Sequence, residues 1–156
     1  LSGRADYPAP DPSVGGGSMA RLSPLYPRAG LNLGERVRPL PADGTVPGMA
    51  GWYAIHTPGH SVGHVSLFRE ADRVLLSGDA VVTTRQESAL AVAAQAPELR
   101  PPPAYLTLDW DEAGRSVAKL ASLRPSVIAS GHGRPMRGPE VAEALRTLAE
   151  RFEAER

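Results

Sequence analysis

Three short apolar segments of this chain each run into a glycine that stands beside a histidine or an aspartate. The polar residues are His60, Asp79 and His132, which lie in the strings TPGH, SGD and SGHG. Short runs rich in branched residues predict β-strands, and glycine lets a backbone turn sharply where a strand ends. The sequence therefore predicts three polar side chains at strand ends, where solvent and a ligand can reach them.

Strand and helix patterns are mixed along residues 49–156. Short apolar runs indicate strands, whereas apolar residues three and four positions apart indicate helices. The segments 63–69 and 73–77 are close enough to form a hairpin, and the second continues directly into Gly78-Asp79. We predict strands at 52–57, 63–69, 73–77 and 126–130, and helices at 87–96, after Asp109 and after Pro139.

The two longer helices have clear boundary signals. Asp109 is a good N-cap, and Glu112, three residues later, would complete a capping box. Pro125 follows the end of this helix, and Pro139 suits the first turn of the last one. Each helix carries one apolar stripe and is predicted to pack against the sheet. The stripes are Ala113, Val117, Leu120 and Leu123, and then Val141, Leu145, Leu148 and Phe152.

Residues 1–48 differ from the rest in composition. This segment holds eight of the sixteen prolines and eight of the sixteen glycines in under a third of the length. Alternating prolines followed by three glycines disfavour both helix and central strand, so residues 1–30 are expected to form a surface arm or mobile loop. One short edge strand is expected at 33–40. We therefore separate a Pro/Gly-rich arm and connecting segment, 1–48, from a folded portion, 49–156.

The residue types at the three strand ends suit a transition metal. Two imidazoles and one carboxylate are ligands for zinc, iron or manganese. The separations along the chain, 19 residues from His60 to Asp79 and 53 from Asp79 to His132, are too long for spacing alone to show convergence. A histidine beside a glycine is also more often a solvated or hydrogen-bonded side chain than a ligand. The residues alone leave both interpretations open.

Taken in order, these strings resemble the later metal-binding motifs of the metallo-β-lactamase-fold hydrolase superfamily. The similar segments read HTPGHSVGH from His56, LLSGD from Leu75 and SGHG from Ser130, and the resemblance covers roughly residues 44–137. It implies an α/β fold, namely the second half of an αββα sandwich with a mixed β-sheet and covering helices. On this interpretation residues 49–156 form the C-terminal portion of a metallo-hydrolase domain.

The resemblance also implies a role for each of the three polar residues. His60 matches the histidine that completes the three-histidine site of the first metal, and Asp79 matches the carboxylate that bridges two metals. His132 matches the last histidine, on the second metal. His64, in the same motif as His60, is expected to form hydrogen bonds nearby rather than to bind a metal. The implied cofactor is zinc, as two ions in the intact site, with iron or manganese as alternatives.

The activity that the resemblance implies is hydrolysis of a small ester, thioester or lactone. Two metal ions that share a water lower its pKa, so a metal-bound hydroxide would be the attacking group at neutral pH. Asp79 would then be the catalytic side chain, because it would hold the two metals and orient the hydroxide. The chain contains no cysteine, which fits a reaction without a cysteine nucleophile. Residues 80–108 are expected to form one wall of the substrate pocket.

One motif of the family is not found in this sequence. The family's first motif, His-x-His-x-Asp-His, lies upstream of the others, and no histidine precedes His56 here. We therefore expect the chain to be the second half of the domain, with too few ligands to complete two metal shells, and to be inactive by itself. Two hypotheses stay open: the parent protein is a metallo-hydrolase, or the chain is an inactive half-domain that acts by association or arises from truncation or proteolysis.

Charge and composition narrow the range of partners. The chain has 17 basic and 17 acidic residues and a net charge of zero, which gives no electrostatic attraction to nucleic acid or to an anionic membrane. No apolar run approaches the ~20 residues that span a bilayer. We expect a small-molecule substrate, no nucleic acid, no membrane and a cytoplasmic location. We also expect a dimer, or association with the missing N-terminal half.

Overall fold

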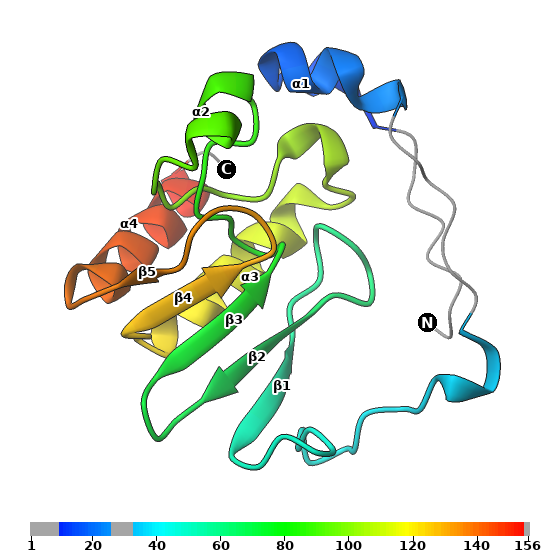
Figure 1. Cartoon of the computed structure of the whole chain (residues 1–156), viewed down its shortest axis with the longest axis vertical. Coiled ribbons are helices and arrows are strands. Elements are labelled where there is room, and N and C mark those ends of the chain that lie inside the picture. Colours follow the sequence, from blue (N-terminus) through cyan, green and yellow to red (C-terminus); the bar gives the residue numbers. More distant parts are fainter. Residues whose placement is uncertain (1–9, 26–32, 155–156) are drawn as a thin grey trace.

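Within residues 10–25 and 33–154, which the computed structural model describes, the chain folds around one five-stranded β-sheet (Figure 1). The strands are arranged in sequence order, and neighbours pair antiparallel except for β3 and β4, which run parallel. The predicted mixed sheet is thus confirmed, with a short fifth strand in addition. The strands are β1 Trp52–His56, β2 Val65–Arg69, β3 Val74–Gly78, β4 Val127–Ser130 and β5 Met136–Arg137.

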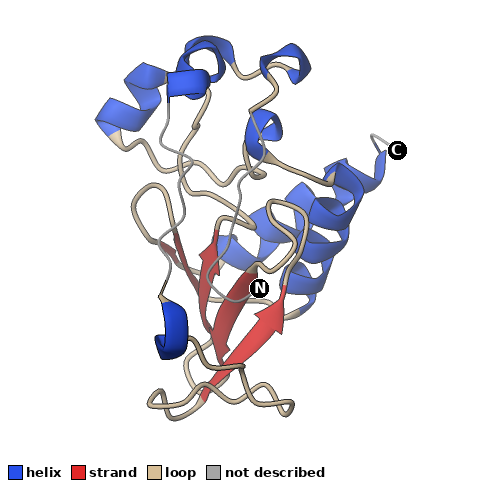
Figure 2. Ribbon diagram, turned by 90° about the vertical axis from the view of Figure 1, so that its right-hand side faces the viewer, coloured by secondary structure: helices blue, strands red, loops and turns tan. Residues whose placement is uncertain are grey.

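The two longest helices, α3 and α4, pack against each other over one face of the sheet (Figure 1, Figure 2). Of the helices in the described ranges, none combines the length and apolar character needed to cross a membrane. The α-helices are α1 Gly17–Leu22, α2 Ala89–Ala94, α3 Trp110–Ser122 and α4 Glu140–Ala154, and the 3-10 turns are Pro12–Val14, Ser23–Leu25, Gly34–Arg36 and Ala104–Leu106.

The start of α3 agrees with half of the predicted capping box. The Asp109 side chain accepts a hydrogen bond from the Glu112 backbone N–H at 2.8 Å, which satisfies one free donor of the first turn. The Glu112 carboxylate pairs instead with Arg115, at 2.7 Å. The Asp109 N–H donates to the carbonyl of Gly59, at 3.0 Å. The helix start is therefore tied to a loop that follows β1.

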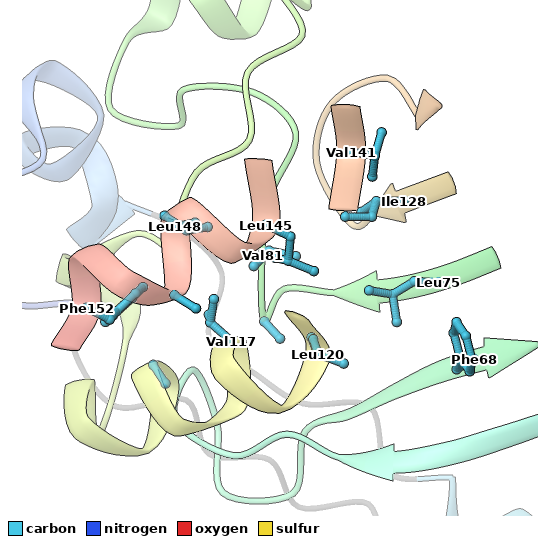
Figure 3. Close-up of a cluster of buried hydrophobic side chains, with 13 residues drawn as sticks. Phe68, Leu75, Val81, Val117, Leu120, Ile128, Val141, Leu145, Leu148 and Phe152 are labelled. Atoms are coloured by element: carbon cyan, nitrogen blue, oxygen red, sulfur yellow. The ribbon is translucent and has the colours of Figure 1, made fainter. Parts of the chain in front are cut away.

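Both predicted apolar stripes point into one core between the helices and the sheet (Figure 3). Val117 and Leu120 of α3 and Val141 and Leu145 of α4 are buried almost completely. The sheet contributes the side chains Phe68, Leu75 and Ile128 to the same cluster. Burying an aliphatic or aromatic side chain of this kind contributes roughly 1.5–3 kcal/mol.

The prediction that no helix forms in the proline- and glycine-rich arm is wrong for its described part. After Gly16, which has a φ of +108°, the segment from Gly17 forms α1. Ala20 of this helix is buried, and the Asp11 N–H donates to the Tyr105 carbonyl at 2.9 Å. The glycines separate the 3-10 turn Pro12–Val14 from α1 and start the helix instead of preventing it. Residues 1–9 and 26–30 of the predicted arm lie outside the described residues.

The edge strand predicted at 33–40 is also wrong. Gly34–Arg36 is a 3-10 turn, and the residues after it belong to no strand. Gly34 has a φ of +53°, which an extended strand does not allow. Pro39 and Pro41 lack the N–H groups that a ladder would need. The connection to β1 therefore consists of turns, as predicted for 42–48.

Candidate functional site

Three strand ends meet at one edge of the sheet. Because β2 is antiparallel to both neighbours and β4 is parallel to β3, the strands β1, β3 and β4 all point in the same direction. His60, Asp79 and His132 follow these strands. His60 Nε2 lies 3.7 Å from Asp79 Oδ2, and His132 Nε2 lies 3.6 Å from Asp79 Oδ1. The fold thus brings the three side chains together, with one imidazole facing each carboxylate oxygen.

An irregularity at the end of β3 precedes Asp79. Between Leu76 and Gly78 the strand has one residue more than its partner β4, so Ser77 is the extra residue of a β-bulge. Bulges near active sites change the direction of a side chain. The Ser77 hydroxyl donates to the Val81 carbonyl at 3.0 Å and so holds the turn. This local geometry sets where the Asp79 carboxylate lies.

A glycine on the neighbouring strand end makes room for this carboxylate. A Cβ atom at Gly131 would lie 2.2 Å from Asp79 Oδ1, so any side chain at residue 131 would force the carboxylate to move. Gly131, the first glycine of the SGHG string, therefore allows the Asp79 carboxylate to lie close to the end of β4.

The loop that carries His60 is fixed on α3. The Gly59 carbonyl accepts from the N–H groups of both Leu108 and Asp109, each at 3.0 Å. A Cβ atom at Gly59 would lie 2.3 Å from the Ala113 nitrogen, so the backbones touch directly. His60 is 8% exposed. Burial lowers its pKa below the ordinary value, and the Asp79 carboxylate acts in the opposite direction.

His132 has a different environment, since its side chain is 52% exposed. Its backbone is nevertheless held from two sides. The His132 carbonyl accepts from the Thr83 N–H at 3.0 Å and from the Ser130 hydroxyl at 2.6 Å. Thr83 is fully buried. The loop is therefore fixed at its main chain, while the imidazole extends into solvent.

His64 lies between Asp79 and buried hydroxyl groups. Its Nε2 accepts from the Asp79 backbone N–H at 2.9 Å, and its Nδ1 lies 2.8 Å from Thr57 Oγ1. Burial lowers the pKa of His64, and the Asp79 charge opposes this. The sequence-based expectation that His64 forms hydrogen bonds nearby agrees with these contacts.

The donor set at the strand ends fits a transition metal in its chemistry. Asp79 Oδ1 is buried and accepts no hydrogen bond from any described residue, as expected of an oxygen reserved for a cation. Among the described residues, however, no group of three or more histidine, aspartate or glutamate side chains is arranged to hold a metal ion by itself. The ligand roles of His60, Asp79 and His132 therefore stay predictions, and the set is incomplete.

Residues 59–63 read Gly-His-Ser-Val-Gly, which is also the pattern of a hydrolase nucleophile elbow. That motif needs a sharp turn from a strand into a helix, which exposes the serine hydroxyl. Here the segment connects two antiparallel strands, β1 and β2. Ser61 therefore does not lie on an elbow, and the glycines serve the loop of His60.

A cavity of about 620 Å³ lies beside this loop. Leu108, whose N–H bonds the Gly59 carbonyl, is part of its wall. The cavity falls in the region where the sequence predicted a wall of the substrate pocket, and its use by a substrate stays a prediction. It is lined by Asp11, Val14, Ala104, Tyr105, Leu106, Thr107, Leu108 and Trp110.

Comparison with known proteins gives consistent matches. The model of the metallo-beta-lactamase superfamily matches residues 3–132. The chain is 45% identical over 152 residues to the probable metallo-hydrolase YflN of Bacillus subtilis (strain 168), covering 97% of this chain and 58% of that protein. It is 30% identical over 91 residues to the probable metallo-hydrolase YqjP of the same organism, covering 58% and 27%.

One solved structure, a beta-lactamase domain protein from Burkholderia ambifaria, has 25% identity and a TM-score of 0.51. The match covers 78% of this chain and 34% of that one. The chain thus spans little more than half the length of YflN and less of the other two.

Proposed function

Because the chain belongs to the metallo-beta-lactamase superfamily, we propose that it supplies part of the metal site of a metal-dependent hydrolase. One observation supports this most directly: His60 and His132 face different oxygens of the single carboxylate of Asp79. A carboxylate with one imidazole at each oxygen is suited to bridge two ions. We propose zinc as the metal, with iron or manganese as alternatives.

In this proposal each residue has its own task. His60 and Asp79 would hold one ion, and His132 and Asp79 the other. Bound metal ions would supply an activated water for the attack and positive charge for the anion that develops on the substrate. Burial lowers the pKa of His60, so its imidazole is neutral and able to bind a metal at neutral pH. Asp79 would keep the two ions at a fixed separation and orient the attacking group.

The proposed substrate is a small ester, thioester or lactone. The net charge of zero gives no support to a polyanionic substrate such as nucleic acid. The cavity beside the His60 loop, with Tyr105 and Trp110 in its wall, would receive the apolar part of such a molecule. Donors that this chain does not contain would have to complete the site.

The proposal is tested by titrating the chain with zinc in a calorimeter. His60→Ala, Asp79→Asn and His132→Ala should each weaken zinc binding at least about tenfold, because each removes a donor. His56→Ala is the matched control. His56 is exposed and its Nε2 donates to the Val62 carbonyl at 2.9 Å, away from the carboxylate, so this variant should bind zinc like the wild type.

Equal zinc affinity in wild type, His60→Ala and Asp79→Asn would contradict the proposal. Absence of zinc binding in the wild-type chain would favour the alternative, an inactive half-domain that acts by association.

A further inference from the structure

Asp79 is held at its main chain by a histidine that is not among the proposed ligands. The backbone N–H of Asp79 follows the bulge of β3 and donates to His64 Nε2, at 2.9 Å. The nitrogen that accepts this hydrogen bond must carry a lone pair and no proton. His64 therefore presents its unprotonated Nε2 to Asp79.

The other ring nitrogen of His64 is the first member of a chain of buried hydroxyl groups. The donor and the acceptor of each hydrogen bond in this chain follow from its last contact, between Ser66 and Ser77. The Ser66 hydroxyl donates its single proton to the Ser77 carbonyl, at 3.0 Å. The contact between Thr57 Oγ1 and Ser66 Oγ, at 3.0 Å, must then use the proton of Thr57. Thr57 Oγ1 can only accept from the imidazole, 2.8 Å away, so Nδ1 carries the proton.

These contacts select one form of the histidine. Only the neutral imidazole with its proton on Nδ1 satisfies both Thr57 and the Asp79 N–H. Both nitrogens are then occupied, so His64 has no lone pair left for a metal. Thr57 and Ser66 are fully buried, which shields this arrangement from competing water.

Gly78 lies directly against the imidazole of His64. Gly78 has a φ of +54°, and a Cβ atom there would lie 2.5 Å from His64 Nε2. Any side chain at residue 78 would push the ring away from the Asp79 N–H. The glycine that ends β3 and the second histidine of the HTPGHSVGH string thus form one structural unit.

We propose that His64 is a positioning residue whose Nδ1-protonated form holds the Asp79 main chain so that the carboxylate faces His60 and His132. The consequence for a metal rests on the proposed function, whereas the hydrogen bond itself does not. In this arrangement the identity of residue 64 matters for the placement of the bridging carboxylate, although residue 64 touches no ion.

The protonation pattern is tested on the unaltered, metal-free chain by long-range proton–nitrogen NMR spectra of the histidine rings. We expect the signal of His64 to show a protonated Nδ1 and an unprotonated Nε2 at neutral pH. A proton on Nε2, or on both nitrogens, would overturn the proposal. This measurement needs no variant and no metal.

A matched pair of substitutions tests the contact with Asp79. The amide oxygen of His64→Gln can replace Nε2 as acceptor, whereas His64→Asn reaches only to the position of Nδ1. We expect hydrogen exchange of the Asp79 amide to stay slow in His64→Gln and to become at least about tenfold faster in His64→Asn. Equal, slow exchange in both variants would contradict the positioning role.

Two further substitutions leave His64 in place and address the hydroxyl chain. Thr57→Val keeps the shape of the side chain and removes the acceptor of Nδ1–H, and Thr57→Ser keeps the hydroxyl. We expect faster exchange at Asp79 in Thr57→Val and rescue in Thr57→Ser. Unchanged exchange of the Asp79 amide in Thr57→Val would show that the Thr57 hydroxyl does not help His64 to hold Asp79.

Zinc titration of the same variants separates the two proposals. If exchange responds as expected but neither wild type nor His64→Gln binds zinc, the metal proposal fails and the positioning role stands. If zinc binds and His64→Asn leaves both exchange and zinc affinity unchanged, the positioning role fails and the metal proposal stands.

Discussion

Both faces of the sheet are largely apolar, but among the described residues long helices pack over only one of them (Figure 2). On the face toward α3 and α4, Phe68, Leu75 and Ile128 are at most 7% exposed. Their neighbours along the strands, Leu67 and Leu76, point to the other face, which we call the open face, and are only partly buried. By register and alternation, the open face also contains the apolar residues Trp52, Ala54, Val65, Val74, Val127 and Ala129 and the polar residues His56, Arg69 and Arg137.

The difference shows that the residues of a strand can indicate a covered face even where no described element covers it. An antiparallel sheet with one wet face has polar residues on that face, whereas strands covered on both sides are apolar throughout. Apart from His56, Arg69 and Arg137, each of which is the last residue of its strand, the open face is apolar, although no helix of the described residues lies over it. This matches what the sequence predicted for half of an αββα sandwich, and the division at residue 48 stays a prediction.

The largest expected effect is a difference in the free energy of unfolding between a leucine-to-alanine substitution on the covered side and one on the open face. Leu120→Ala, on the covered side, should lower the free energy of unfolding by about 2–5 kcal/mol, because Leu120 is fully buried among α3, α4 and the sheet. Leu67→Ala is the counterpart on the open face and should cost much less. Urea unfolding of both variants measures the difference, and equal losses would break the distinction.

A smaller effect concerns the loop that joins the site to the covered side. Gly59→Ala places a Cβ atom against the Ala113 backbone at a φ of +127°. Gly48→Ala is a matched control, because Gly48 has a φ of +79° and open space around it. Overpacking should make Gly59→Ala about 1–3 kcal/mol more destabilising than the control. If urea unfolding gave the same loss for both, the loop would not depend on its close approach to α3.

Two of the histidines beside Asp79, His60 and His64, should make the free energy of unfolding depend on pH. Burial lowers the pKa of both His60 and His64 from the ordinary 6.5. Below pH 6.5 the unfolded chain binds protons that the folded chain does not, so the free energy of unfolding falls as the pH falls toward the lowered values. Urea unfolding of the metal-free chain at a series of pH values measures this.

His64→Gln removes one of the two histidines whose pKa is lowered, so the stability of this variant should depend less on pH. A steeper dependence in His64→Gln than in the wild type would show that burial does not govern these histidines.

The smallest effect on stability should come from the open face itself. Leu67→Lys should change the free energy of unfolding by no more than about 0.5 kcal/mol, since the ammonium group can reach solvent. We expect the wild-type chain to self-associate through this apolar surface and Leu67→Lys to weaken that association. Sedimentation velocity at several concentrations tests the self-association of the wild type and its weakening in Leu67→Lys. A wild type that stays monomeric would rule out the expected dimer.

Much of this molecule could be predicted from local patterns. The core strands and the stripes of α3 and α4 follow from apolar periodicity, and each lies within a few residues of its predicted position. β5 is only two residues long, too short for a pattern. The helix α1 was missed because its glycines were interpreted as barriers, whereas Gly16 and Gly17 adopt the positive φ angles that start it.

The site could be predicted in its residue types but not in its construction. His60, Asp79 and His132 stand out because they follow strands and glycines. The bulge at Ser77 and the hydrogen bonds of Thr57 leave no local signal, since serine and threonine are common in strands and loops. Such contacts depend on which strands become neighbours. The metal identity, the bridging role of Asp79 and a cytoplasmic location stay predictions.

The parallel pairing of β3 with β4 also has a consequence for how the molecule folds. His60, His64 and Asp79 belong to a contiguous stretch of antiparallel hairpins, whose contacts are local and close quickly. His132 arrives only after α2 and α3 have crossed over to bring β4 alongside, which requires closing a much longer loop. We therefore expect the carboxylate to meet its first imidazole early in the folding reaction and its second one late.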